Sequence, residues 1–95
     1  DSQIKQRLKK LEQRIAALGV EADDYHAAVS AEFSLDVVER LAAGGSMSST
    51  TRKLIARGQI ELSIEQAVVD WAVDLPLTAS LVEDARGRLG YWRSQ

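Results

Sequence analysis

Apolar residues in the first 18 positions recur at alternating intervals of four and three. Ile4, Leu8, Leu11, Ile15 and Leu18 therefore share one narrow stripe. This spacing predicts an amphipathic helix that packs against one or two other helices. A glycine follows at position 19, where it is suited to end the helix in the left-handed conformation.

Residues 20–43 also favour helix, but their pattern leaves two arrangements open. After a short turn, Asp23 or Asp24 is suited to cap the next helix. The apolar stripe is weak at its start and stronger from residue 35 onward. Since Ser34 could cap a separate helix, one bent helix and two short helices both fit the pattern.

A short helix and a longer one are predicted between residues 50 and 75. Either Thr50 or Thr51 is suited to cap the first helix. Ser63 begins a capping-box pattern at the start of the second helix, whose apolar residues occupy more than one side. The polar residues that remain for water on this helix are Glu65, Gln66, Asp70 and Asp74.

The last helix is predicted to follow the single proline, Pro76, with Thr78 or Ser80 as its cap. Glycines at positions 87 and 90 weaken it, so we expect fraying near Tyr91. No segment has the alternation of a strand. The fold class is therefore predicted to be all-α: a small four-helix-bundle-like domain built from two helical halves, with room for an extra short helix.

The sequence Gly44-Gly45-Ser46 precedes Met47, the only methionine, and small polar residues follow. A helix C-cap and loop of a native protein could have this composition. It is also what joining two genes would leave, with Met47 as the start of the second, and we favour this second interpretation. The chain then divides into residues 1–43 (the N-half), a Gly-Gly-Ser linker at 44–46, and residues 47–95 (the C-half).

Composition argues against most chemistry. The chain has 95 residues, no cysteine and one histidine, His26, which excludes disulfides, cysteine metal sites and histidine-dependent nucleophiles within one chain. Its acidic pairs lie at a helix start or on polar helix faces, where they suit solvation rather than catalysis. We therefore predict no enzymatic activity, no catalytic residue, no metal and no cofactor.

Charge and hydropathy make several partners improbable. The net charge is −2, and the C-half holds six basic and six acidic side chains, whereas a DNA reader usually has a positive excess. The longest apolar runs are far short of the roughly 20 residues that span a bilayer. We therefore predict a cytoplasmic protein that binds no nucleic acid, membrane or small-molecule substrate.

One segment resembles a known family. Residues 53–69, Lys-Leu-Ile-Ala-Arg-Gly-Gln-Ile-Glu-Leu-Ser-Ile-Glu-Gln-Ala-Val-Val, are similar to a pattern at the N-termini of some modular polyketide synthase subunits. The similarity is to docking domains of the four-helix-bundle type from trans-acyltransferase assembly lines, which serve antibiotic biosynthesis. It covers about a third of the chain; the N-half matches in helical character and size only.

The resemblance implies that the two halves bind each other and so pair consecutive synthase subunits. The C-half would be the N-terminal docking segment of the downstream subunit, and the N-half the C-terminal docking segment of the upstream one. An apolar interface is expected at Leu8, Leu11, Ile15, Val38, Leu41, Leu54, Ile55, Val68 and Trp71. A charged rim that sets partner choice is expected at Lys9, Lys10, Arg14, Asp70 and Asp74.

Two other functions remain open. One is a helical regulatory domain, either a DNA-binding module or an oligomerisation segment of a bacterial transcription factor. The basic residues at 52, 53, 57, 86, 88 and 93 would then lie near phosphates. The other is a helical adaptor pair of the toxin–antitoxin kind, which sequence does not separate from docking.

Overall fold

The computed structural model describes residues 2–94, and within this range helices are the only regular secondary structure. The prediction of an all-α fold is confirmed. The N-half contains α1 (Ser2–Ala16), α2 (Asp23–Ser30) and α3 (Ser34–Ala43). The C-half contains α4 (Ser49–Ala56), the 3-10 turn η1 (Ile60–Leu62), α5 (Ile64–Trp71) and α6 (Ala79–Arg93).

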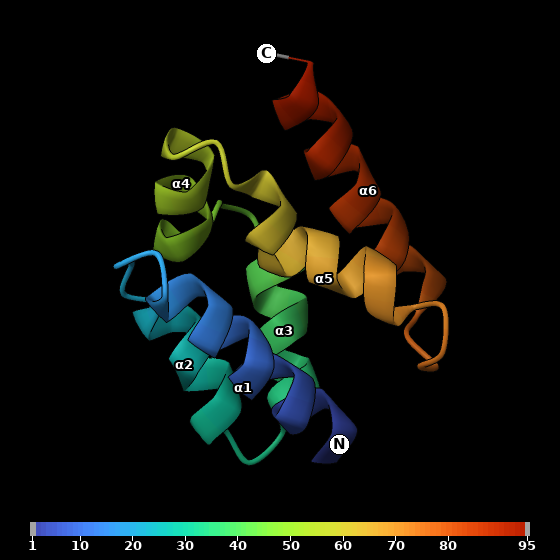
Figure 1. Cartoon of the computed structure of the whole chain (residues 1–95). Coiled ribbons are helices and arrows are strands. Elements are labelled where there is room, and N and C mark those ends of the chain that lie inside the picture. Colours follow the sequence, from blue (N-terminus) through green and yellow to red (C-terminus); the bar gives the residue numbers. More distant parts are fainter. Residues whose placement is uncertain (1, 95) are drawn as a thin grey trace.

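The helices of the two halves interleave rather than form separate lobes. In the N-half α2 packs on both α1 and α3, and in the C-half α5 packs on α6. Across the halves, α2 contacts α4 and α3 contacts both α5 and α6. Figure 1 shows α5 near the middle of the molecule, with α1 and α3 on one side and α6 on the other.

The first helix forms as its spacing predicts. Ile4, Leu8, Leu11 and Ile15 are all buried, whereas Leu18 lies beyond the end of α1 and stays 38% exposed. Gly19 has a φ of +78°, the left-handed conformation that glycine adopts without steric cost. It therefore ends this segment as expected.

The segment 20–43 forms two helices, and Lys5 of α1 marks the break between them. Its ammonium group donates to the carbonyl of Val29, at 3.4 Å, and to the carbonyl of Ala31. A cation at a helix C-terminus stabilises carbonyls that have no intrahelical partner. Ala31 is accordingly extended, with φ −72° and ψ 151°.

Several predicted caps are shifted by one to three residues. Ala22 occupies the N-cap position of α2, so Asp23 and Asp24 lie in its first turn. Ser48, rather than either following threonine, caps α4 by accepting from the Thr51 N–H at 3.1 Å. A cap depends on where the backbone enters the helix, which tertiary packing decides here.

The cap of α5 is confirmed, but its end is not. Ser63 accepts from the Gln66 N–H at 3.2 Å. The helix ends at Trp71 and turns occupy residues 72–74. Hydrogen bonds to the third preceding residue, such as Asp74 N–H to Trp71 C=O at 3.1 Å, replace the helical pattern there.

The expectation that α6 frays near Tyr91 is wrong. The helix continues to Arg93. Leu89, two residues earlier, is buried, and the Ser94 hydroxyl donates to the Tyr91 carbonyl at 2.8 Å. Packing and this terminal hydrogen bond offset the weak helix propensity of the two glycines.

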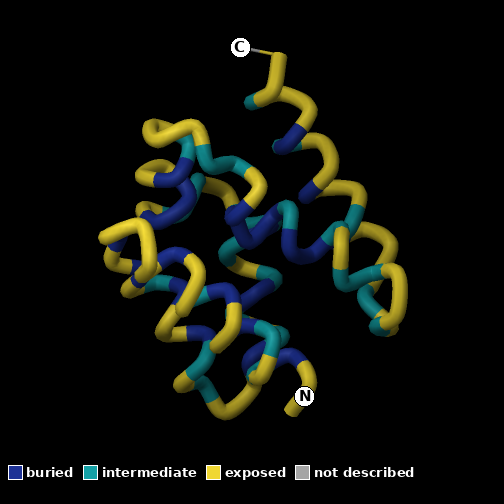
Figure 2. Tube along the Cα trace, in the orientation of Figure 1, coloured by how far each residue is buried: buried dark blue, intermediate teal, exposed yellow. Residues whose placement is uncertain are grey.

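The buried apolar side chains other than Leu89 form one connected cluster to which both halves contribute. Figure 2 shows the buried positions on the inward sides of the helices. The N-half members of the cluster are Ile4, Leu8, Leu11, Ile15, Val20, Ala22, Tyr25, Ala28, Val38 and Ala42. Its C-half members are Leu54, Leu62, Ile64, Ala67, Val68, Leu81 and Ala85.

A test of the linker follows from the close approach of Gly44 to the last turn of α3. A Cβ at Gly44 would collide with the carbonyl oxygen of Arg40, whereas one at Gly45 would meet nothing within 4 Å. We expect Gly44→Ala to lower the free energy of unfolding by about 1–3 kcal/mol, as overpacking does. Gly45→Ala should change it by less than about 0.5 kcal/mol, like most surface substitutions. Equal urea midpoints for the two variants would contradict the close approach.

Candidate functional site

The candidate site is the contact surface between the N-half and the C-half, called here the half–half interface. It comprises the contacts of α2 with α4, of α3 with α5 and α6, and of α1 with η1. Its interior holds apolar side chains together with a few buried polar ones, and its edge carries exposed charged groups.

The structure places most of the expected apolar interface residues in the shared cluster. Six of them are buried there: Leu8, Leu11, Ile15, Val38, Leu54 and Val68. Leu41 and Trp71 are half-buried and pack against the cluster. Ile55 is half-buried but lies outside the cluster.

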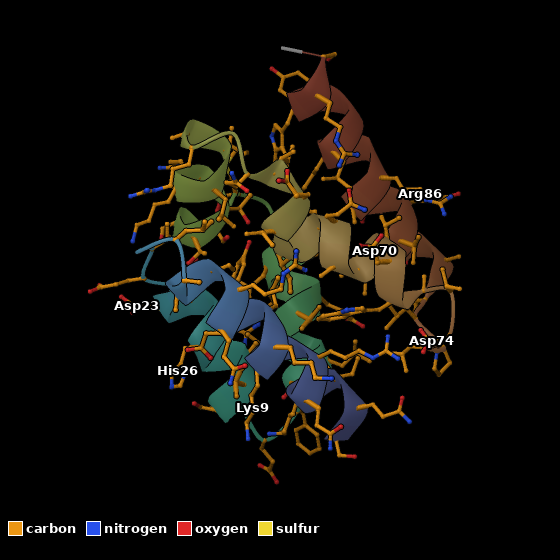
Figure 3. All side chains as sticks on the ribbon, in the orientation of Figure 1. Lys9, Asp23, His26, Asp70, Asp74 and Arg86 are labelled. Atoms are coloured by element: carbon orange, nitrogen blue, oxygen red, sulfur yellow. The ribbon has the colours of Figure 1, made fainter. Side chains whose placement is uncertain are left out.

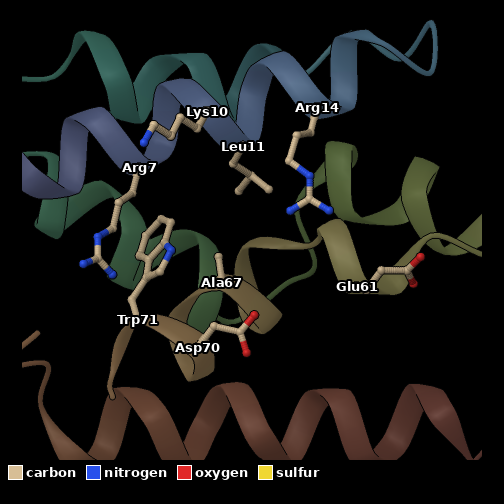
Figure 4. A pocket seen from close by; sticks show the side chains of 8 residues that line it. All are labelled: Arg7, Lys10, Leu11, Arg14, Glu61, Ala67, Asp70 and Trp71. Carbon is tan, nitrogen blue, oxygen red and sulfur yellow. The ribbon is translucent and has the colours of Figure 1, made fainter. Parts of the chain in front are cut away.

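A hollow of about 170 Å³ lies between α1 and α5. Its walls hold Lys10, Leu11 and Arg14 from α1 opposite Asp70 and Trp71 from α5; Arg7, Glu61 and Ala67 complete the lining. Figure 4 shows the indole of Trp71 directed from α5 toward α1, between the side chains of Arg7 and Leu11.

The structure brings together three of the five expected rim residues. Lys10, Arg14 and Asp70 line this hollow, where Asp70 accepts a hydrogen bond from the Gln66 amide at 2.9 Å. Lys9 is exposed on α1 and does not line the hollow, and Figure 3 shows it well apart from Asp74.

Asp74 has a partner that the sequence did not suggest. Its two oxygens accept from the guanidinium of Arg7, Oδ1 at 3.0 Å from Nη1. The hydrogen bond from Arg7 lowers the pKa of Asp74. Residues 7, 11 and 14 lie on one face of α1. The position of Leu11 in the apolar stripe could therefore have indicated that Arg7 lies near the interface.

Tyr25 is the main polar residue at the centre of the interface. It is 1% exposed, and its hydroxyl accepts from the Ile64 N–H at 2.9 Å and bonds to the hydroxyl of Thr51. Ile64 is the first residue of α5, so its N–H has no intrahelical acceptor. Burial raises the pKa of Tyr25 far above its usual range, so the phenol stays neutral.

Asp24, the neighbour of Tyr25, binds the N-terminus of α4. Its carboxylate accepts from the Thr50 N–H at 3.2 Å, from the Thr50 hydroxyl, and from the Ser49 hydroxyl at 3.5 Å. Partial burial opposes ionisation of Asp24, but the hydrogen bonds from Thr50 outweigh it and lower its pKa. An anion is also favoured here by the positive end of the α4 dipole.

The expectation that Glu65 faces water is wrong, since it is 0% exposed. Its Oε1 accepts from the Thr51 hydroxyl at 3.2 Å, and its Oε2 accepts from Arg88 at 3.3 Å. Helix α6 supplies that guanidinium and covers the face of α5 that the pattern had left to solvent. Burial raises the pKa of Glu65, although the hydrogen bonds from Thr51 and Arg88 act in the opposite direction.

Arg88 also joins α6 to the end of α3. Besides Glu65, its guanidinium donates to the carbonyl of Leu41 at 3.2 Å and to the carbonyl of Gly44. Leu41 lies in the last turn of α3, where carbonyls lack intrahelical partners. Arg88 therefore stabilises a helix end of the N-half from within the C-half.

Sequence reasoning missed this polar set, which consists of Asp24, Tyr25, Thr51, Glu65 and Arg88. One signal was present. The predicted central helix was too apolar to leave any side wholly in water, so a polar residue on it such as Glu65 needed an internal partner. The identity of that partner depends on how α6 docks, which local pattern does not determine.

The buried Glu65 is expected to make the folded protein less stable as pH rises. Because its folded pKa lies above its ordinary value of 4.5, its contribution to stability is present below pH 4.5 and is lost as pH rises through the folded pKa. We expect the free energy of unfolding of the wild type to fall relative to that of Glu65→Gln as pH rises from about 4.5 toward neutrality. Urea unfolding across this range measures the difference.

Glu61→Gln removes an exposed carboxylate from neighbouring η1 and is the matched control. A difference between wild type and Glu65→Gln that stays constant with pH, or that Glu61→Gln reproduces, would contradict the account of Glu65.

Within residues 2–94 no group of three His, Asp or Glu side chains is arranged to hold a metal ion. No helix in the same range is long and apolar enough to cross a membrane. Comparison of the chain with family models, curated proteins and solved structures finds no match.

Proposed function

We propose that this chain is a non-catalytic docking module in which the N-half and the C-half recognise each other. One observation carries the proposal: the apolar core is a single cluster to which both halves contribute. The linker residues 44–46 are not members of this cluster, which is formed by helices that pack on one another across the interface.

Helix length supports the same function. Helices α2, α4 and α5 have eight residues each, and isolated helices below about 12–15 residues are marginal in water. Segments as short as the N-half and the C-half also bury too little apolar surface to be stable alone. Each half therefore depends on the other for a core, as docking partners do.

The resemblance of residues 53–69 narrows the proposal to modular polyketide synthases of the trans-acyltransferase type. The N-half then ends an upstream subunit and the C-half begins the next, in the cytoplasm. Their association would hold the upstream carrier protein near the downstream domain that receives the growing chain. The module itself requires no cofactor and transfers no group.

The direct test is to cut the folded chain within its linker. A protease site inserted between Gly45 and Ser46, both exposed, allows cleavage after folding. We expect the cleaved halves to stay associated and to dissociate on dilution with a roughly micromolar Kd, about −8 kcal/mol. Gel filtration and fluorescence anisotropy of a labelled half would measure this. Halves that separate at millimolar concentration and each keep their helicity would overturn the proposal.

The apolar centre of the interface gives a second prediction. Leu11→Asp replaces a leucine of the shared cluster that is 7% exposed with a charged side chain. Arg7, Lys10 and Arg14 line the adjoining hollow and offset part of the cost of burying that charge, so we expect the Kd of the cleaved halves to rise by at least about tenfold. Gln13→Asp adds the same charge on the exposed side of α1. It should change the Kd by less than about threefold, as surface substitutions do. Unchanged affinity for Leu11→Asp would mean that the α1 stripe does not support the interface.

A further inference from the structure

We infer that the C-half selects its partner through the Asp24–Tyr25 pair. The partner class it accepts is a helical segment whose second helix begins with an acidic residue followed by tyrosine. This inference rests on the proposed docking function and names the residues that give it specificity. Selection by Asp24 and Tyr25 differs from selection by an outer charged rim, because these two side chains make their contacts largely out of reach of water.

The first step is the direction of the hydrogen bonds around Tyr25. Thr51 has one hydroxyl proton, and it donates that proton to Glu65. The Tyr25 hydroxyl must therefore donate to Thr51 while its oxygen accepts from the Ile64 N–H. One hydroxyl from the N-half thus satisfies a donor and an acceptor of the C-half at once.

The second step concerns a partner without that hydroxyl. Ile64, Thr51 and Glu65 are each 0% exposed, so water does not replace the missing group in the assembled state. The N–H of Ile64 would be left without an acceptor inside the core. Sites built to hydrogen-bond a hydroxyl reject analogues that lack it for this reason, which is discrimination against the wrong partner.

The third step concerns Asp24, which approaches the start of α4 from the N-half. Ser48 of the C-half already accepts from the Thr51 N–H, but the Thr50 N–H reaches Asp24. Thr50 is also 0% exposed. A partner that lacks an acidic residue at this position would leave the Thr50 donors unpaired beside a helix N-terminus that favours an anion.

The outer ion pair has a weaker claim to selectivity. The side chains of Arg7 and Asp74 are 28% and 56% exposed, and exposed pairs contribute little and are screened by salt. The contacts of Tyr25 are buried, so salt should not reduce their effect.

The test compares matched substitutions in the cleavable chain. Tyr25→Phe removes only the hydroxyl at the interface, and Tyr91→Phe makes the same change at a 64% exposed position of α6. We expect Tyr25→Phe to raise the Kd of the cleaved halves by roughly 10- to 100-fold, in both 0.1 M and 0.5 M NaCl, from the cost of an unsatisfied buried group. Tyr91→Phe should stay within about threefold of the wild type.

A second pair of variants does not depend on the core. Asp23 and Asp24 both lie in the first turn of α2, but Asp23 is exposed and Figure 3 shows it at the outer edge of that helix. Asp24→Ala should raise the Kd by roughly 5- to 50-fold, since it removes charge-assisted hydrogen bonds. Asp23→Ala also removes an acidic side chain from the first turn of α2, and it should raise the Kd less than Asp24→Ala does.

The outcomes separate this inference from the proposed function. Wild-type halves that do not associate after cleavage would refute the docking function itself. Wild-type halves that associate while Tyr25→Phe and Asp24→Ala match their controls would refute the selecting pair alone. If Tyr25→Phe prevents folding even of the uncut chain, Asp24→Ala and Asp23→Ala decide the question: equal Kd values refute the inference and the predicted difference supports it.

Discussion

The hydroxyl of Tyr25 is the contact on which the polar centre of this structure depends. It joins α2 to the first residue of α5 and to α4 in one place. Through Thr51 and Glu65 the same hydrogen bonds continue to Arg88 of α6. Four helices are thereby fixed relative to one another by a connected network in which every member has a partner, the condition under which buried polar groups specify a single packing.

Much of the fold could be predicted because it is local. The stripe of α1, the turn at Gly19 and the cap at Ser63 each depend on spacing within a few residues. The division of residues 20–43 could not be decided, because Lys5 of another helix marks the break. The burial of Glu65 was predicted wrongly because it depends on a guanidinium 23 positions further along the chain.

The candidate site divides in the same way. Apolar interface residues could be proposed from periodicity, since a stripe predicts its own burial. Polar partners could not, because a pattern gives the face of a residue and not the atom opposite it. Arg7 illustrates this: it lies on the same side of α1 as Leu11, yet its pairing with Asp74 depends on turns that follow α5 earlier than expected.

Arg88 contacts the end of α3 and the first linker residue through the main-chain oxygens of Leu41 and Gly44 rather than through side chains. A main-chain carbonyl is present whatever residue occupies a position. The hydrogen bond from Arg88 therefore does not depend on which side chain occupies position 41, so that side chain can change in evolution without the loss of this contact. Tyr25 has no such freedom, because its own hydroxyl makes the contact. Among related pairs, position 41 should accordingly diverge faster than position 25.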